Sequence, residues 1–152
     1  MTRALFCYYY SNNMAANTQF SIAAHIMACL GQAAGEEVNS AAIAGSVNTS
    51  ASFVRRILAK LSKAGLVTTT TGKGGACWLA RRAGDISLLE IYRAVDASPA
   101  FAIHQYPAEK SCTVSRNIKS AMGRVLNETQ QALEQRLSRI SLAQVVADLR
   151  KK

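Results

Sequence analysis

The chain has 152 residues, of which 49% are hydrophobic and 7% are aromatic. This composition supplies enough apolar side chain for a packed core and excludes an intrinsically disordered protein. The formal net charge is +9, from 18 Lys and Arg against 9 Asp and Glu. Such an excess favours a polyanionic partner, either nucleic acid or an acidic membrane surface. The sequence contains no apolar run of the roughly 18 residues that a membrane-spanning helix needs.

The distribution of the charged residues and the spacing of the cysteines give further information about the partner and the cellular compartment. No Asp or Glu occurs between residues 38 and 84, a stretch that holds Arg55, Arg56, Lys60, Lys63, Lys73, Arg81 and Arg82. The N-terminus lacks the pattern of a secretion signal, so we expect a cytoplasmic protein. The four cysteines are widely spaced without a Cys-x-x-Cys pair, and in that compartment we expect them to be thiols. They are Cys7, Cys29, Cys77 and Cys112.

Residues 1–13 differ from the rest of the chain. Three consecutive tyrosines followed by Ser-Asn-Asn have no helical period, and Met14 comes directly after them. We expect this leader to be a non-native or disordered addition, with Met14 as the biological start. The alternative is a short arm that packs on the domain.

Amphipathic periodicity predicts a first helix over residues 16–31, ended by Gly31. Ser40 is expected to cap a second, short helix. After a turn at residues 48–49, a third helix runs from about residue 50 to residue 64 and stops at Gly65, where a left-handed cap is favoured. Two short helices joined by a brief turn are typical of the helix-turn-helix motif.

The third helix has two different faces. Its apolar residues fall on one side, which we expect to be buried: Val54, Ile57, Leu58 and Leu61. The other side carries small polar and basic residues, which suit the major groove of DNA. The predicted DNA contacts of this helix are Ser50, Ser52, Arg55, Arg56, Lys60 and Lys63. The alternative is a solvated basic face that binds nothing.

A β-hairpin is expected after the third helix. Residues 66–71 have high β propensity, residues 72–75 form a glycine-rich turn, and residues 76–80 can return as a second strand. This pattern predicts a wing with Lys73 at its tip, in reach of a phosphate or the minor groove. A nucleotide-binding loop is disfavoured, because the GxxxxGK[ST] spacing is missing and no helix follows the turn.

The C-terminal half is predicted to be helical around an irregular loop. Ser87 is expected to cap a helix, residues 97–112 are irregular, and a long amphipathic helix follows from about residue 113 to residue 139. That helix spans about 40 Å, too long for one small domain to cover its apolar stripe, so pairing with a second copy is expected. The predicted dimer contacts include Val125, Leu133 and Leu137. Ser141 is expected to cap a last short helix.

From about Asn17 to Leu149 the chain resembles the Rrf2 family of transcriptional regulators. The resemblance rests on NTQFSIAAHIMACL in the first helix, SVNTSASFVRRILAKLSKAGLV in the helix-turn-helix, GKGGACWLAR in the wing, ISLLEIYRAVD in the next helix, and the region from His104 onward. It implies a homodimer that crosses its long helices, places each recognition helix in a major groove and lays each wing along a minor groove.

The implied fold is mostly α-helical with a small β-hairpin, a winged helix-turn-helix followed by a long C-terminal dimerisation helix. We divide the chain into a leader (1–13), a winged helix-turn-helix DNA-binding domain (14–96), a sensor loop (97–112), and a unit with the dimerisation and C-terminal helices (113–152).

One branch of that family binds an iron–sulfur cluster through three closely spaced cysteines before the long helix. This chain has only Cys112 there, so it resembles the branch with a single cysteine, and no metal or other cofactor is expected. Two departures from the family pattern occur. Ala76-Cys77-Trp78 follows Gly75 where Gly-Gly-Tyr is usual, and Thr113 takes the place of a proline.

Cys112 is the main candidate sensor. It lies at the start of the long helix, where the helix dipole and the neighbouring Lys110 and Arg116 favour a thiolate. The alternative is an inert, half-buried cysteine. Cys29 and His104 are further sensor candidates, and an intersubunit link between Cys29 and Cys112 is one arrangement that dimers of this kind allow. The rival signal is a small molecule bound in the same loop by Phe101, His104 and Tyr106.

We therefore predict a sequence-specific regulator of transcription that binds double-stranded DNA as a homodimer, with repression the favoured mode, and that is not an enzyme. Its effector is an oxidant or a small molecule. Two other classes are considered. A hydrolase using Cys112 and His104 would need a third, orienting group, which the sequence does not supply. A protein-interaction adaptor would use the same fold without DNA.

Overall fold

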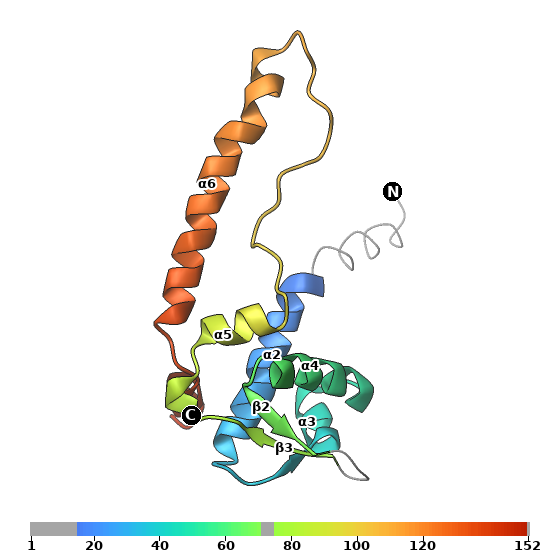
Figure 1. The fold of residues 1–152 in the computed structure, drawn as a ribbon, viewed down its shortest axis with the longest axis vertical. Coiled ribbons are helices and arrows are strands. Elements are labelled where there is room, and N and C mark those ends of the chain that lie inside the picture. The colour runs from blue at the N-terminus through green and yellow to red at the C-terminus, as the bar shows by residue number, and fades with distance from the viewer. Residues whose placement is uncertain (1–14, 71–74, 152) are drawn as a thin grey trace.

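A computed structural model describes residues 15–70 and 75–151, with the side chains of residues 15–17 excepted. The molecule has a globular head from which a long helical arm extends (Figure 1). In the described part of the chain, no helix is both long and apolar enough to cross a membrane. The expected leader, Met14 and the expected wing-tip residue Lys73 lie outside the described residues.

Three helices build the helix-turn-helix part of the head: α2 (Ala15–Gln32), α3 (Ser40–Val47) and α4 (Ala51–Lys63). Their apolar faces meet in one core, which includes Ile26, Met27, Ile43, Val54 and Leu61. The predicted recognition helix is confirmed at both ends. Ser50 caps its start, and Gly65 follows its end with φ +71°, a left-handed conformation that glycine adopts without a steric penalty.

The start of α3 differs from the prediction. Asn39 is the cap, because its side-chain Oδ1 accepts a hydrogen bond from the Ala42 backbone N–H at 2.7 Å. Ser40 is the first helical residue and is buried. Its hydroxyl faces α4, where it accepts a hydrogen bond from Arg55. The prediction that Ser40 caps this helix was therefore wrong.

α2 ends at Gln32, one residue beyond the predicted end at Gly31. A Cβ at residue 31 would lie 2.8 Å from Val146 Cγ2, so the missing side chain lets α7 (Leu142–Leu149) pack directly on α2. Leu142 is completely buried in this contact region. The last helix, which we expected to form one unit with the long helix, belongs to the core of the head.

The wing contains three strands. β2 (Val67–Thr69) and β3 (Ala76–Leu79) form the predicted hairpin, and β1 (Val38–Asn39) pairs with the other edge of β3. All pairs are antiparallel, with Val38 opposite Cys77 and Thr69 opposite Cys77 on the other side. Sequence patterning did not reveal β1, because two residues are too few to show an alternation of apolar and polar side chains.

The remaining elements join the head to the arm. A short 3₁₀ helix, η1 (Ala83–Asp85), precedes α5 (Leu88–Ala94). Ser87 and Ser141 cap α5 and α7 through capping boxes, as predicted. The irregular segment 97–112 then runs beside α6 (Thr113–Ser138) to the tip of the arm (Figure 1). The 26 residues of α6 span about 39 Å.

Candidate nucleic-acid interface

The candidate interface centres on the outward face of α4. The predicted apolar stripe of this helix is buried, which turns the opposite side toward solvent. The exposed side chains there are Ser52, Arg55, Arg56, Ala59 and Lys63. Ser50 fixes the start of the helix, because its Oγ accepts a hydrogen bond from the Phe53 backbone N–H at 3.3 Å. The helix therefore presents three cations without an acidic neighbour on the same face.

Arg55 is held toward a concave surface between α4, the start of α3 and the strands of the wing. Its Nε donates a hydrogen bond to Ser40 Oγ at 3.3 Å. The concavity has a volume of about 620 Å³, and its walls include Asn39, Ser40, Arg55, Thr69 and Thr70. Hydroxyl, amide and guanidinium groups are the donors that position a protein on a phosphate backbone. The shape of this surface and its polar groups suit one edge of a DNA groove.

Arg56 occupies the other side of the same face. Its guanidinium lies over the Phe53 ring, 5.2 Å from the ring centroid, a cation–π contact that limits the conformations of a long side chain. Phe53 itself is half-buried. An arginine that is already oriented loses less conformational entropy on binding than a free one. Arg55 and Arg56 thus both point outward from α4, with different intramolecular supports.

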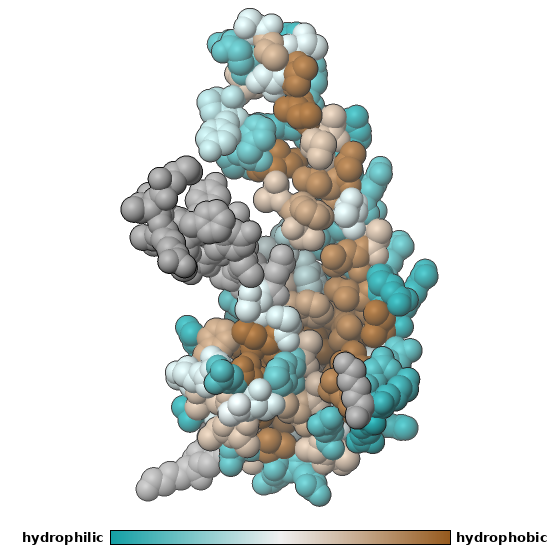
Figure 2. Space-filling model, turned by 180° about the vertical axis from the view of Figure 1, so that it is seen from behind, coloured by the Kyte–Doolittle hydropathy of each residue, from teal (hydrophilic) through white to brown (hydrophobic). Residues whose placement is uncertain are grey.

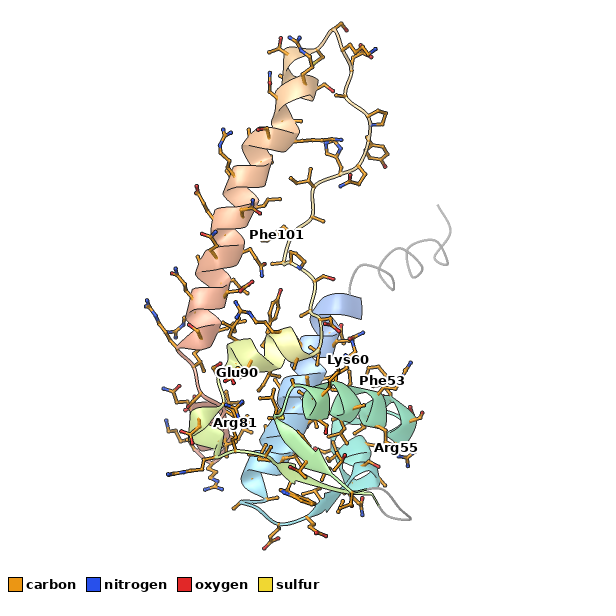
Figure 3. All side chains as sticks on the ribbon, in the orientation of Figure 1. Phe53, Arg55, Lys60, Arg81, Glu90 and Phe101 are labelled. Atoms are coloured by element: carbon orange, nitrogen blue, oxygen red, sulfur yellow. The ribbon has the colours of Figure 1, made fainter. Side chains whose placement is uncertain are left out.

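Lys60 lies beside Arg56 on α4, at the half-buried border of the outward face, and its side chain is directed to partners within the protein. Its Nζ donates hydrogen bonds to Gln19 Oε1 and to the Val95 carbonyl, both at 3.3 Å, and lies 3.4 Å from Asp96 Oδ2. Figure 3 shows Lys60 on the side of α4 near the end of α5, and Arg55 on the side near α3. These contacts hold the ammonium group of Lys60 against the protein, although its side chain is still 39% exposed, and a DNA contact of Lys60 stays a prediction.

Four polar residues of this surface were not predicted from the sequence. Asn39 and Ser40 come from the start of α3, and Thr69 and Thr70 come from the end of β2 and the residue after it. The threonines were assigned only to a strand, and Ser40 only to a cap. No sequence signal places them beside Arg55, because the contact depends on how the wing folds back onto α4.

Cys77 lies in the wing but not on its surface. It is 1% exposed, and its thiol donates a hydrogen bond to the Val38 carbonyl at 2.9 Å. Burial raises the pKa of the Cys77 thiol above its ordinary value. Both effects keep this sulfur protonated and shielded, so Cys77 is the least suited of the described cysteines to react with an oxidant.

The two other described cysteines lie far apart in the fold. Cys112 is exposed at the arm tip and caps α6, its Sγ accepting from the Ser115 backbone N–H at 3.5 Å. Cys29 is half-buried in the head, where its thiol donates to Ser46 Oγ at 3.5 Å. Within one chain the structure does not bring them together. An intersubunit link between them stays a prediction.

The candidate effector-binding residues of segment 97–112 are exposed to solvent. The His104 ring lies against the Tyr106 ring, with centroids 5.7 Å apart. Among the described residues no hydrogen bond joins His104 to Cys112, so the pair required by the hydrolase alternative is not formed. Phe101 and Tyr106 are 61% and 76% exposed, and they therefore lie on the surface of the loop and do not enclose a cavity.

The arm carries an apolar surface that the described part of the chain covers only partly. No residue of α6 is buried, and its most exposed apolar side chains lie three and four residues apart: Val114, Ile118, Met122 and Val125. Figure 2 shows apolar residues extending along the arm from the head. Leu133 and Leu137 differ from Val125, because they are half-buried in the part of α6 that packs on α5.

These features define a winged helix-turn-helix protein with a helical arm. The model of the Rrf2 family, described as an iron-dependent transcriptional regulator, matches residues 16–148. The chain belongs to the Rrf2 family.

Relatives and solved structures agree with this assignment. The chain is 37% identical over 134 residues to YwnA of Bacillus subtilis (strain 168), named as a candidate HTH-type transcriptional regulator; the match covers 88% of this chain and 98% of YwnA. A crystal structure of a candidate DNA-binding protein is 35% identical with a TM-score of 0.66, covering 84% of this chain and 97% of that one. IscR of T. potens has a TM-score of 0.66 at 24% identity, covering 91% and 90%, and supports the fold alone.

The family description names iron, and the three cysteines in the described part of the chain do not fit an iron site. Cys112 lies at the arm tip, Cys29 in the head, and Cys77 is committed to the Val38 carbonyl. Across residues 15–70 and 75–151, no three His, Cys, Asp or Glu side chains are close enough to hold one metal ion. We therefore derive no step through iron or an iron–sulfur cluster.

Proposed function

We propose that this protein binds double-stranded DNA as a homodimer, recognises a specific operator through α4, and regulates transcription in the cytoplasm, with repression the favoured mode. The observation that carries the proposal is the outward face of α4. Arg55 and Arg56 are presented there without acidic neighbours, and each is oriented by a contact within the protein. Arginine is the commonest reader of guanine in the major groove.

The arm supports the dimeric form of the proposal. The exposed apolar stripe of α6 needs a partner surface of similar length, and the same stripe on a second copy has that length. A two-fold dimer would hold two recognition helices at a fixed separation, so its operator should be a pseudo-palindrome with half-site centres about 10 bp apart or a small multiple of that.

The test begins with selection of bound fragments from the source genome, followed by binding measurements on the recovered operator. With about 6–10 phosphate contacts, affinity should fall by about 10³–10⁵ between 50 and 200 mM salt. Arg55→Ala and Arg56→Ala should each cost about 1–3 kcal/mol and relax specificity where the arginine reads a base. Operator binding that is unchanged in the double variant would refute the role of α4.

Weak binding that does not depend on salt would favour the adaptor alternative instead. Hydrolysis of a generic ester, lost in Cys112→Ala, would favour the hydrolase.

The signal is a separate part of the proposal. Cys112 is the exposed cysteine of the described chain and stands where segment 97–112 meets α6. Oxidation of its sulfur would add a polar oxygen or a disulfide at this junction. A change there would alter the arm that sets the spacing of the two recognition helices. A small molecule bound by the same segment is the rival effector.

A further inference from the structure

Lys60 differs from the other basic residues of α4 because its ammonium group makes two hydrogen bonds and one ion pair within the chain. An ammonium group has three N–H donors, and three acceptors surround this one: Gln19 Oε1 from α2, the Val95 carbonyl, and Asp96 Oδ2. A group with this many internal partners would have to give them up to bind a phosphate. We propose that Lys60 and Asp96 are positioning residues that fix the recognition helix on α5.

The end of α5 is built to receive this contact. The Ala97 backbone N–H donates to the Tyr92 carbonyl, and the Asp96 N–H donates to the Arg93 carbonyl. These two hydrogen bonds form a Schellman motif, in which the residue after the cap is left-handed and is usually glycine. Asp96 holds that position with φ +51°. An aspartate tolerates this conformation better than most residues, and here its carboxylate meets Lys60.

The position of Val95 adds to the contact. Val95 is the C-cap of α5, so its carbonyl belongs to the negative end of the helix dipole, where a cation is stabilised. Lys60 thus interacts with the backbone of α5 as well as with the carboxylate of Asp96. The contact orients α4 relative to α5 through two different kinds of acceptor.

α5 is in turn attached to the arm. Gln130 of α6 donates from Nε2 to the Tyr92 hydroxyl at 3.2 Å, and Arg93 pairs with Glu134 of α6 at 2.7 Å. The recognition helix is therefore connected to the arm through α5. Because operator recognition by a dimer requires a fixed separation of the two recognition helices, a loosened α4 should lose specific binding more than non-specific binding.

This inference rests on the proposed DNA-binding function, and its test compares Lys60 with Lys63 on the same helix. Lys63 is exposed and is a candidate phosphate contact. Each is replaced by methionine, which keeps an unbranched side chain one atom shorter than lysine and removes the charge. Binding is measured to the selected operator duplex and to a random-sequence duplex of equal length, over a range of salt concentrations.

Lys60→Met should weaken operator binding about three- to tenfold, leave random-sequence binding unchanged and keep the salt slope of the wild type. Lys63→Met should weaken binding to both duplexes and lower the slope by about one. If Lys60→Met instead lowers the slope and weakens both duplexes as Lys63→Met does, Lys60 is a phosphate contact and the inference is wrong.

A second experiment uses Asp96. For this residue, the loss of negative charge and the loss of the contact with Lys60 predict opposite effects on DNA binding. Asp96→Gly removes a negative charge, which by electrostatics alone should tighten DNA binding, and it relieves the left-handed backbone, so the variant should fold at least as well. The inference predicts weaker operator binding in this variant and near wild-type binding in Asp96→Asn, whose amide oxygen can accept from Lys60. Unchanged or tighter binding by Asp96→Gly would overturn it.

Failure of DNA binding and failure of the positioning role give different results. If wild type and Lys63→Met bind both duplexes alike and without salt dependence, the proposed function fails. If Lys63→Met behaves as expected while Lys60→Met and Asp96→Gly match wild type, only the positioning role fails.

Discussion

At the residue scale, the three described cysteines of this protein differ in exposure and in hydrogen bonding. Cys112 is exposed, Cys29 is half-buried, and Cys77 is buried beneath the wing with its thiol bonded to the Val38 carbonyl. The thiolate is the reactive form of cysteine, and burial raises the pKa of Cys77 and so reduces its thiolate fraction. The departure of the wing from the family pattern thus places a buried thiol in the sheet, at the base of the concavity beside Arg55.

These environments predict an order of reaction with iodoacetamide near pH 8. In the folded protein Cys112 should be alkylated first, Cys29 more slowly, and Cys77 only after the head unfolds. Mass spectrometry of the separate cysteine peptides over time measures this order, and denatured protein provides the control in which all react. Alkylation of native Cys77 as fast as Cys112 would contradict the buried position. A loss of the oxidant response in Cys112→Ser, with reduced-state operator affinity intact, would further identify Cys112 as the sensor.

At the scale of the elements, the contact between α2 and α7 depends on one glycine. Gly31 interrupts no helix, and its missing side chain gives room to Val146. Gly31 is the second-last residue of α2, and its missing side chain is explained by the close packing of α7. This packing brings the C-terminal helix into the same core as the helix-turn-helix.

Gly31→Val should therefore destabilise the head by about 1–3 kcal/mol through overpacking. Gly45→Val is the matched control, because Gly45 also lies in a helix and a Cβ there would meet nothing within 4 Å. Denaturant unfolding followed by circular dichroism measures both. Equal midpoints for the two variants would show that α7 adjusts freely and that the close approach is not required.

At the scale of the whole molecule, the arm leaves an apolar stripe exposed, and a partner surface that covers it would stabilise the arm. Val114, Ile118, Met122 and Val125 lie on a face of α6 directed away from α5, and they are between 37% and 68% exposed. Leu133 is less informative as a probe of the dimer, because it is already half-buried within its own chain. A substitution there would damage the attachment of α6 to the head as well as any contact between subunits.

The sharper test replaces Ile118 and Val125 together by aspartate. Each aspartate would place an unpaired charge in the subunit contact, at a cost of several kcal/mol, so sedimentation should report monomers. Ser120→Asp with Asn127→Asp adds the same charge to exposed positions on the other side of α6 and should remain dimeric. A dimer that survives in the Ile118 and Val125 variant would place the subunit contact elsewhere.

The ends of several helices and the buried side of α4 are determined by interactions between residues close in sequence. Ser50, Ser87 and Ser141 begin their helices by binding backbone N–H groups three residues ahead, and Gly65 ends α4 through its own conformational freedom. The apolar period of α4 likewise fixes which of its sides is buried, since an amphipathic helix has one stripe to cover. For this reason the helix-turn-helix, the wing hairpin and the long helix were all predicted correctly.

Only the tertiary structure decided how these elements use their polar groups. Lys60 and Arg55 have the same sequence character, yet one binds the end of α5 and the other binds Ser40, because they lie on opposite flanks of a helix wedged between two different neighbours. The same is true of β1, whose two residues become a strand only beside β3. For a polar side chain at the border of a buried face, the element that packs there decides which partner it binds. That element is distant in sequence, so the sequence pattern does not reveal the partner.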